Sequence, residues 1–163
     1  LINYLHKIGW FIGLVLLQVL ILNNVHIAGY ATPFLYIYLI LKFESDTPRN
    51  ALMLWAFFLG LAVDVFSDTP GMNAAATVLL AFLRHFPAAV RASLDTLVPA
   101  IRTMGILPFL KYLVVSVLIH HGLLLTLEFF SFAHIGTLLL RIAASTLLTV
   151  TCIMAVEGIR KKG

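Results

Sequence analysis

The sequence predicts an all-helical integral membrane protein that folds as a single bundle. Hydrophobic residues make up 61% of the 163 residues, charged residues only 11%, and the mean hydropathy is +1.03. Soluble domains carry about 25% charged residues, so this composition excludes an ordinary soluble fold. Backbone groups that face lipid must be hydrogen-bonded within their own segment, and the apolar segments are therefore expected to be helices.

Six apolar segments are candidate membrane spans, and no linker, internal repeat or low-complexity stretch divides them. We expect these spans at about 8–25, 29–43, 51–68, 73–90, 107–130 and 137–158. The first lacks a small-residue cleavage site and is expected to be retained rather than removed as a signal peptide. The second is short for a full crossing, so it is expected to tilt little, to thin the bilayer locally or to lie partly under its neighbours. Residues 1–163 are thus predicted to form one polytopic domain.

The basic residues predict the orientation of these spans. If the N-terminus is cytoplasmic, only Arg141 lies on the outer side of the membrane. The other ten, all on the inner side, are Lys7, Lys42, Arg49, Arg84, Arg91, Arg102, Lys111, Arg160, Lys161 and Lys162. Lys and Arg gather on the cytoplasmic side of membrane proteins, so both termini are predicted to be cytoplasmic. The net charge of +4 then reflects topology and contact with anionic lipid, and no nucleic-acid partner is expected.

A segment at about 91–106 connects the fourth and fifth spans on the inner side. Leu94, Leu97 and Ile101 recur in it at helical spacing, which is typical of an amphipathic helix lying at a membrane interface. Pro99 would interrupt such a helix unless a second helical turn begins there. The favoured interpretation is a connection that lies on the membrane. The alternative is a docking surface for a cytoplasmic partner.

Asp64 is the most costly residue for a membrane span, because it follows Gly60 while the run is still apolar. A carboxylate at depth costs about 2.5–3.5 kcal/mol on insertion scales, so it normally faces the bundle interior and meets a donor. Asp68 shares a helix face with Gly60 and Asp64, but lies nearer the surface, where solvation accounts for it. The residues Thr69-Pro70-Gly71 are expected to end this helix, and Asn73 to cap the next one.

Further polar residues are expected to join helices. Gln18 and Asn23 in the first span are predicted to donate to Asp64 or Asp68 from the same outer half of the bundle. Glu128 and Arg141 lie near the outer ends of consecutive antiparallel spans, and an ion pair between them is predicted. Its net contribution is expected to be small, because desolvation offsets the attraction.

His120 and His121 lie in the middle of the fifth span. Adjacent residues on a helix point about 100° apart, so the two rings are poorly placed to bind one metal ion. A metal site or proton relay built from Asp64, His121 and Glu128 is the less favoured interpretation, and bonds to neighbouring helices are the favoured one. Small residues at Gly9-xxx-Gly13 and Ala56-xxx-Gly60 permit close helix approach.

The pattern Gly60-x3-Asp64-x6-Gly71-x2-Ala74 is similar to the most recurrent feature of the rod-shape-determining MreD family. Further residues resemble that family or one branch of it: Gln18, Asn23, Pro33, the run Arg102-Thr103-Met104-Gly105, Tyr112, the His120-His121 pair and Glu128. With the chain length and the six spans, the resemblance covers nearly the whole chain. One position departs from the family, because the residue after Pro33, often acidic in relatives, is Phe34 here.

This resemblance implies a subunit of the bacterial cell-elongation machinery in the cytoplasmic membrane. Members of the family partner the bitopic protein MreC. Through it they partner the actin-like MreB and the RodA/transpeptidase pair that polymerises and cross-links peptidoglycan. The family's fold is similar to the six-helix substrate-capture subunits of energy-coupling-factor vitamin transporters. The implied role is therefore support of rod shape and of lateral peptidoglycan synthesis.

Two functions are compared on this basis. The leading one is a non-catalytic scaffold that binds another membrane protein through lateral helix packing. The alternative is a small-molecule-binding subunit of a vitamin-type transporter, with a pocket lined by Asn23, Asp64, Asp68 and Asn73. The first span shows no clear Ala-xxx-Ala face for a coupling subunit, which favours the scaffold. The sequence has no nucleophile elbow, HExxH motif, phosphate-binding loop or Cys/His metal spacing, so we expect no enzyme activity, cofactor or metal.

Overall fold

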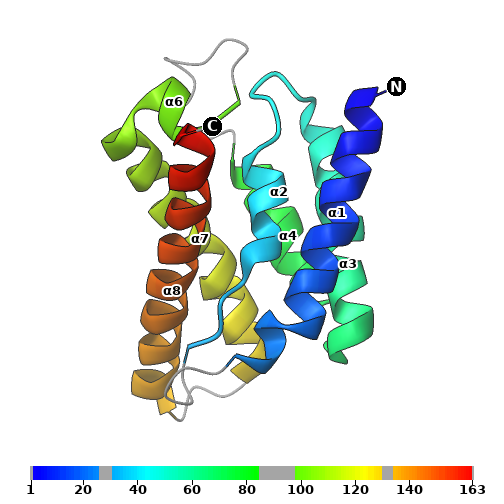
Figure 1. Ribbon diagram of the computed structural model, residues 1–163. Coiled ribbons are helices and arrows are strands. Elements are labelled where there is room, and N and C mark those ends of the chain that lie inside the picture. Colours follow the sequence, from blue (N-terminus) through cyan, green and yellow to red (C-terminus); the bar gives the residue numbers. More distant parts are fainter. Residues whose placement is uncertain (1, 26–30, 85–97, 130–133, 163) are drawn as a thin grey trace.

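The computed structural model describes residues 2–25, 31–84, 98–129 and 134–162, which form an all-helical bundle (Figure 1). Four of its helices are long and apolar enough to cross a membrane by length and composition. These candidate spans are Leu5–Asn24, Arg49–Ser67, Ile106–Phe129 and Ile135–Arg160. They agree with the first, third, fifth and sixth spans predicted from the sequence to within a few residues.

The helices follow one another around the bundle. In chain order they are α1 (Ile2–Leu20), the 3-10 turns η1 (Leu22–Asn24) and η2 (Leu35–Ile37), α2 (Tyr38–Leu41), α3 (Arg49–Ser67), α4 (Met72–Leu83), α6 (Ile101–Met104), α7 (Ile106–Phe129) and α8 (Ile135–Lys162). Helix α1 packs on α3, α3 on α4, α4 on α7, and α7 on α8. The start of α1 and the end of α8 lie at one end of the bundle, called here the terminal end (Figure 1). The turn between α3 and α4 lies at the opposite end, called the hairpin end.

The second predicted span, 29–43, is not a continuous helix over its described residues, and its burial agrees with the alternative that it lies under its neighbours. Residues 31–34 are not helical, a 3-10 turn follows, and only the four residues of α2 are α-helical. This segment lies between α1 and α8 in the middle of the bundle (Figure 1), and the side chains of Tyr36, Ile37 and Ile40 have no exposed surface. Non-helical backbone is tolerated at membrane depth where protein surrounds it and supplies its hydrogen bonds. Residues 31–43, called here the core segment, therefore form the core of the bundle rather than a lipid-facing helix.

The fourth predicted span, 73–90, is described as a helix only over α4, which is 12 residues long. Residues 85–90 lie outside the described part of the chain, as do residues 91–97 of the predicted interfacial segment. The remainder of that segment forms the short helix α6, which begins two residues after Pro99. It ends at Gly105, whose φ of +83° favours glycine.

Candidate functional site

The carboxylate of Asp64 joins α3 to the first turn of α4. Its side chain is 3% exposed, and Oδ1 accepts hydrogen bonds from the backbone N–H of Asn73 at 2.9 Å and from the Thr69 hydroxyl at 2.9 Å. Oδ2 accepts from the backbone N–H of Ala74 at 2.9 Å. The first N–H groups of a helix lack partners within it and attract negative charge. Asp64 therefore caps α4 from the neighbouring helix, and the expectation that the Asn73 side chain caps it is wrong: α4 begins at Met72, after Gly71, without a side-chain cap at its N-cap residue.

The other motif residues meet at the same junction. A Cβ atom on Gly60 would lie 2.5 Å from the Ala74 Cα and 2.6 Å from the Asn73 carbonyl oxygen, so only glycine allows this approach of α3 to α4. Gly71 has a φ of +80°, which glycine adopts without strain, and leads into α4. Gly60, Asp64, Gly71 and Ala74 thus form one structural unit, called here the α3–α4 junction.

Asp68 has a separate place at this end of the bundle. It is exposed and is the residue that ends α3, in the left-handed conformation with a φ of +54°. Aspartate tolerates that conformation better than most residues, because its short polar side chain bonds locally. Its position therefore serves the turn between the helices rather than the contacts of Asp64.

Gln18 and Asn23 bind partners other than the aspartates, so the prediction that they donate to Asp64 or Asp68 is wrong. The Gln18 amide nitrogen donates to the Pro33 carbonyl at 2.9 Å and to the Asn23 side-chain oxygen at 2.9 Å. Its amide oxygen accepts from the backbone N–H of Leu35 at 2.8 Å. Asn23 then donates to the Ser67 hydroxyl at 2.7 Å. Gln18 therefore replaces the hydrogen bonds that the non-helical segment cannot make to itself.

Helix α8 supports the same segment from its other side. The backbone N–H of Phe34 donates to the Thr149 hydroxyl at 3.1 Å, and that of Thr32 donates to the Ser145 hydroxyl at 3.2 Å. Ser145 and Thr149 lie one helical turn apart and are both buried. Side chains of α1 and α8 thus satisfy successive backbone groups of residues 32–35, which explains why this stretch needs no helix.

The two histidines of α7 bind different elements, as the 100° offset predicts. His120 Nε2 lies 2.8 Å from the Tyr36 hydroxyl, and that hydroxyl donates to the Asn73 side chain at 2.9 Å. His121 Nε2 lies 3.1 Å from the Thr149 hydroxyl. In the described part of the chain, no three His, Cys, Asp or Glu side chains are close enough to hold a metal ion. The histidines therefore connect α7 to the core segment, to α4 and to α8.

A cavity of about 470 Å³ lies at the hairpin end. Asn23, Asn73, Glu128 and Arg141 are among its lining residues, together with hydrophobic side chains; the carboxylates of Asp64 and Asp68, which we expected there, are not. The Arg141 guanidinium lies 5.1 Å from the centre of the Phe129 ring. Glu128 and Arg141 thus face one space, and an ion pair between them stays a prediction.

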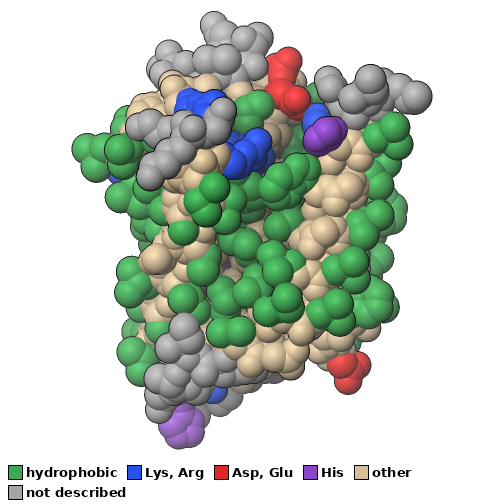
Figure 2. All heavy atoms as spheres, in the orientation of Figure 1, with side chains coloured by type: hydrophobic (Ala, Val, Ile, Leu, Met, Phe, Trp, Pro, Cys, Tyr) green, Lys and Arg blue, Asp and Glu red, His purple; other side chains and the backbone are tan. Residues whose placement is uncertain are grey.

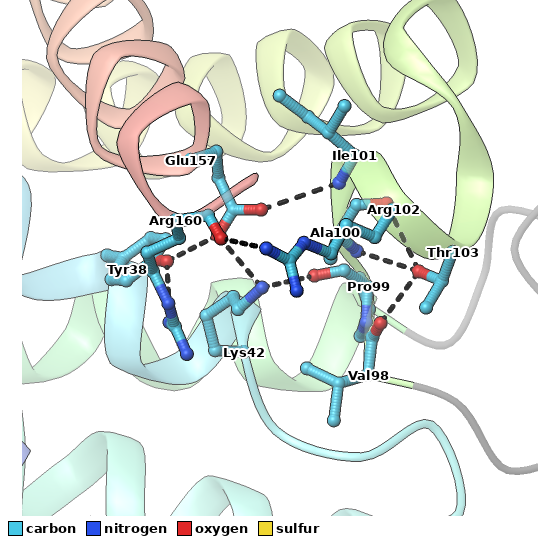
Figure 3. Close-up of polar contacts among 10 residues, drawn as sticks. All are labelled: Tyr38, Lys42, Val98, Pro99, Ala100, Ile101, Arg102, Thr103, Glu157 and Arg160. Carbon is cyan, nitrogen blue, oxygen red and sulfur yellow. Dashed lines mark hydrogen bonds and ion pairs between the residues drawn. The ribbon is translucent and has the colours of Figure 1, made fainter. Parts of the chain in front are cut away.

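A second polar cluster, at the terminal end, joins elements far apart in the sequence (Figure 3). Glu157 of α8 accepts from Lys42 Nζ at 2.9 Å, from the Tyr38 hydroxyl and from the backbone N–H of Ile101 at 3.4 Å. Lys42 also donates to the Pro99 carbonyl at 3.0 Å. The cluster holds α2, α6 and α8 together. Sequence reasoning missed it, although an acidic residue just before the basic C-terminal run is a signal that a partner cation is needed.

Arg84 has a structural role beyond the topology inferred for it. Its side chain is buried and donates to the Ile40 carbonyl at 2.9 Å and to the Phe43 carbonyl. The Ile40 carbonyl also accepts from the backbone N–H of Phe43 at 3.4 Å, so Arg84 adds side-chain donors to the carbonyls at the end of the core segment.

The chain matches no family model, no curated protein and no solved structure.

Proposed function

We propose that this chain is a non-catalytic membrane scaffold of the bacterial cell-elongation machinery, which binds an MreC-like bitopic protein. Through that partner it would connect to the actin-like MreB and to the RodA/transpeptidase pair, and so support rod shape and lateral peptidoglycan synthesis. The observation that carries this proposal is the α3–α4 junction. The residues that resemble the MreD family, from Gly60 to Ala74, are those that meet in this contact between two helices.

The contacts of the buried polar residues favour a scaffold over a chemical function. Both oxygens of Asp64 accept hydrogen bonds from α4, Gln18 binds the core segment through both ends of its amide, and His121 binds Thr149. Groups held in this way set the geometry of the helices and have little freedom to bind a reacting molecule. A bundle fixed by such contacts offers a constant outer surface to a protein partner.

The proposed topology has six crossings, as in the substrate-capture subunits of vitamin transporters. Four would be made by the long helices α1, α3, α7 and α8, one by the core segment and one by α4. An even number of crossings agrees with the position of both chain ends at the terminal end (Figure 1). With the basic side chains gathered mainly at that end (Figure 2), both termini are proposed to lie in the cytoplasm of a bacterium.

Helix α1 is the proposed contact for the partner's span. Of the residues in its most apolar stretch, 17% are buried, against 28% to 44% in the other three candidate spans. Helix α1 is therefore the least covered of the four. Ile8, Ile12, Leu16 and Leu20 are exposed at four-residue spacing and form one continuous ridge. Lateral packing of a second apolar helix against this ridge needs no change in the bundle.

Crosslinking in living cells tests this proposal. A photoreactive amino acid at Ile12 is expected to capture the MreC-like protein. The same probe at Leu147, which is equally apolar and 71% exposed on α8, is the matched control and is expected to capture none of it. Purification without crosslinking should retain the same partner. Equal capture at both positions would contradict the α1 contact, and absence of an MreC-like protein from both assays would contradict the scaffold function.

The cavity at the hairpin end favours a second candidate function, a small-molecule-binding subunit. It is lined by three asparagines, a carboxylate and a guanidinium group, and Arg141 Nε is buried without a hydrogen-bond partner. A bound small molecule that persists through purification, and is lost in an Arg141→Gln variant, would favour this function. A scaffold predicts that the variant retains the MreC-like partner.

A further inference from the structure

The surface of α1 and the terminal end of α8 border an open recess that the scaffold function does not use. Its polar part, about 510 Å³, is lined by His6, Lys7, Trp10, Tyr38, Leu39, Lys42, Phe43, Glu44, Val98 and Arg160. Its apolar part is a groove of about 600 Å³ along one face of α1, lined by Leu5, His6, Gly9, Trp10, Gly13, Leu14 and Leu17. His6 and Trp10 belong to both, so the two parts are continuous. We name the whole space the α1–α8 recess.

The polar part of the recess carries a positive charge. Lys7, Lys42 and Arg160 line it together with the carboxylate of Glu44. Lys42 also pairs at 2.9 Å with Glu157, which is not a lining residue, so three cations meet two carboxylates. Lys7 pairs with Glu44 at 2.8 Å, whereas the Arg160 guanidinium lies against two neutral groups, the Tyr38 hydroxyl at 3.1 Å and the Trp10 ring at 5.6 Å. These neutral contacts orient the guanidinium without compensating its charge, so the polar part favours an anion.

The apolar part is open because two residues lack side chains. A Cβ atom on Gly9 or Gly13 would have no neighbour within 4 Å, so the groove is not filled by other helices. From Leu5 to Leu17 the helix rises by about 18 Å, at 1.5 Å per residue. One leaflet of the hydrocarbon core is about 15 Å thick. The groove is therefore about as long as a single leaflet is thick. The basic part lies at the terminal end of the groove, at the depth of the lipid headgroups.

We propose that the α1–α8 recess binds one anionic glycerophospholipid, with its phosphate near Arg160, Lys42 and Lys7 and an acyl chain along Gly9 and Gly13. A charged headgroup joined to a hydrocarbon chain matches both parts of the recess and their order along α1. An apolar partner helix would match the groove but leave the positive part uncompensated. Bacterial cytoplasmic membranes supply this ligand at the required depth, and a basic pocket between spans is a site of this kind.

Lipid binding to the purified full chain in detergent, followed by native mass spectrometry, tests the proposal. The probes are phosphatidylglycerol and phosphatidylcholine with identical acyl chains, and glycerol phosphate as a headgroup without chains. We expect one phosphatidylglycerol per chain, preferred over phosphatidylcholine by at least about fivefold, and no binding of glycerol phosphate. The fivefold preference corresponds to about 1 kcal/mol, which is the contribution of one basic residue near an anionic headgroup.

Two pairs of variants separate the headgroup from the chain. Arg160→Gln is expected to reduce the preference for phosphatidylglycerol about fivefold, whereas Lys111→Gln, which removes an exposed cation of α7 outside the recess, leaves it unchanged. Gly13→Leu fills part of the groove and displaces about two methylene groups of the acyl chain. It is therefore expected to weaken the binding of both lipids about tenfold. Gly136→Leu is its matched control, because a Cβ there also meets nothing within 4 Å. Unchanged thermal unfolding of each variant confirms that it is folded.

Several results would overturn the proposal. Equal binding of the two lipids, or equal lipid binding by all four variants, would exclude a specific site. Tight binding of glycerol phosphate would assign the polar part to a free phosphate compound instead. Loss of a co-purifying single-span protein from Gly13→Leu, with lipid binding intact, would assign the groove to a protein.

Discussion

The two polar clusters of this bundle each provide donors for a buried carboxylate. They lie at opposite ends of the bundle and join residues over very different distances along the chain. At the hairpin end, Asp64 finds its donors at Asn73 and Ala74, only nine and ten residues further on. At the terminal end, Glu157 binds Lys42, which lies more than a hundred residues earlier in the chain. The first cluster forms within one helical hairpin, whereas the second forms only when the whole bundle has closed. A substitution at each end should therefore disturb structures of different extent.

The largest expected effect is at the terminal end. Glu157→Ala removes the carboxylate that holds α2, α6 and α8, and leaves Lys42 partly buried without its counter-charge. The expected loss is about 3 kcal/mol, the lower limit for breaking a buried ion pair, because the Lys42 side chain keeps 15% of its surface exposed. Thermal unfolding in detergent measures it. The double variant Lys42→Met/Glu157→Leu should recover most of the loss, and failure to recover would show that the charge pair is not its cause.

At the hairpin end, Gly60→Ala tests the close contact of α3 with α4. The added Cβ would meet the backbone of Ala74 at 2.5 Å, and backbone atoms cannot move aside as a flexible side chain can. We expect a loss of about 2 kcal/mol, typical of overpacking. Gly136→Ala is the control, since its Cβ meets nothing within 4 Å, and it should be at least as stable as the wild type because alanine favours a helix over glycine. Equal stability of both variants would contradict the described contact.

Between the two ends, Thr149→Val tests the side-chain support of the core segment. Valine has the shape of threonine but accepts no hydrogen bond, so the backbone N–H of Phe34 loses its buried acceptor. The expected cost is about 1–2 kcal/mol. Thr151→Val, on the same helix, is the control, because Thr151 is exposed and bonds only the carbonyl of Leu147. Hydrogen exchange at Phe34 should quicken in the first variant and not in the second.

The smallest expected effect concerns the partly exposed ion pair of Lys7 and Glu44 at the terminal end. The hydrogen bond from Lys7 lowers the pKa of the Glu44 carboxyl below its usual value. Its contribution to stability is therefore fully present above the pKa of an unfolded glutamate, about 4.3, and is lost as the pH falls through the lowered folded value. Because both side chains are partly exposed, the contribution is below about 1 kcal/mol.

Stability measured between pH 7 and pH 3 checks this prediction. Glu44→Gln should be less stable than the wild type at pH 7, and the difference should disappear at the acidic limit. Asp46→Asn, at an exposed carboxylate two residues away, is the control. A difference that stays constant down to pH 3 would show that the charge of Glu44 does not contribute.

How much of this structure was predictable depends on the range of the contacts. The helical class, four of the six long apolar segments as helices and the burial of Asp64 follow from local composition and spacing, and the structure confirms them. The form of residues 31–43 was missed, because its hydrogen-bond partners Gln18 and Thr149 lie elsewhere in the chain. A single apolar run cannot show whether lipid or protein surrounds it, and that difference decides whether it must be a helix.

The same reasoning explains the outcomes at the polar residues. Asp64 was expected to meet donors from the first span, but the hairpin supplied closer ones in the N–H groups that α4 leaves without partners. Glu157 and Arg84 had no expected structural role, because no periodicity connects them to Lys42 or to the Ile40 carbonyl. Residues paired across the closed bundle are therefore the part of the site that sequence alone did not reveal.

The most direct test of the account is the stability of Asp64→Asn compared with Asp68→Asn. Asparagine keeps the shape of Asp64 but turns an NH2 group toward a backbone N–H that the carboxylate now accepts, so we predict a loss of about 1–3 kcal/mol in detergent unfolding. Asp68→Asn, four residues later at an exposed left-handed position, should leave stability unchanged. Equal stability of the two variants would contradict the claim that Asp64 is bound within the bundle and holds α3 to α4.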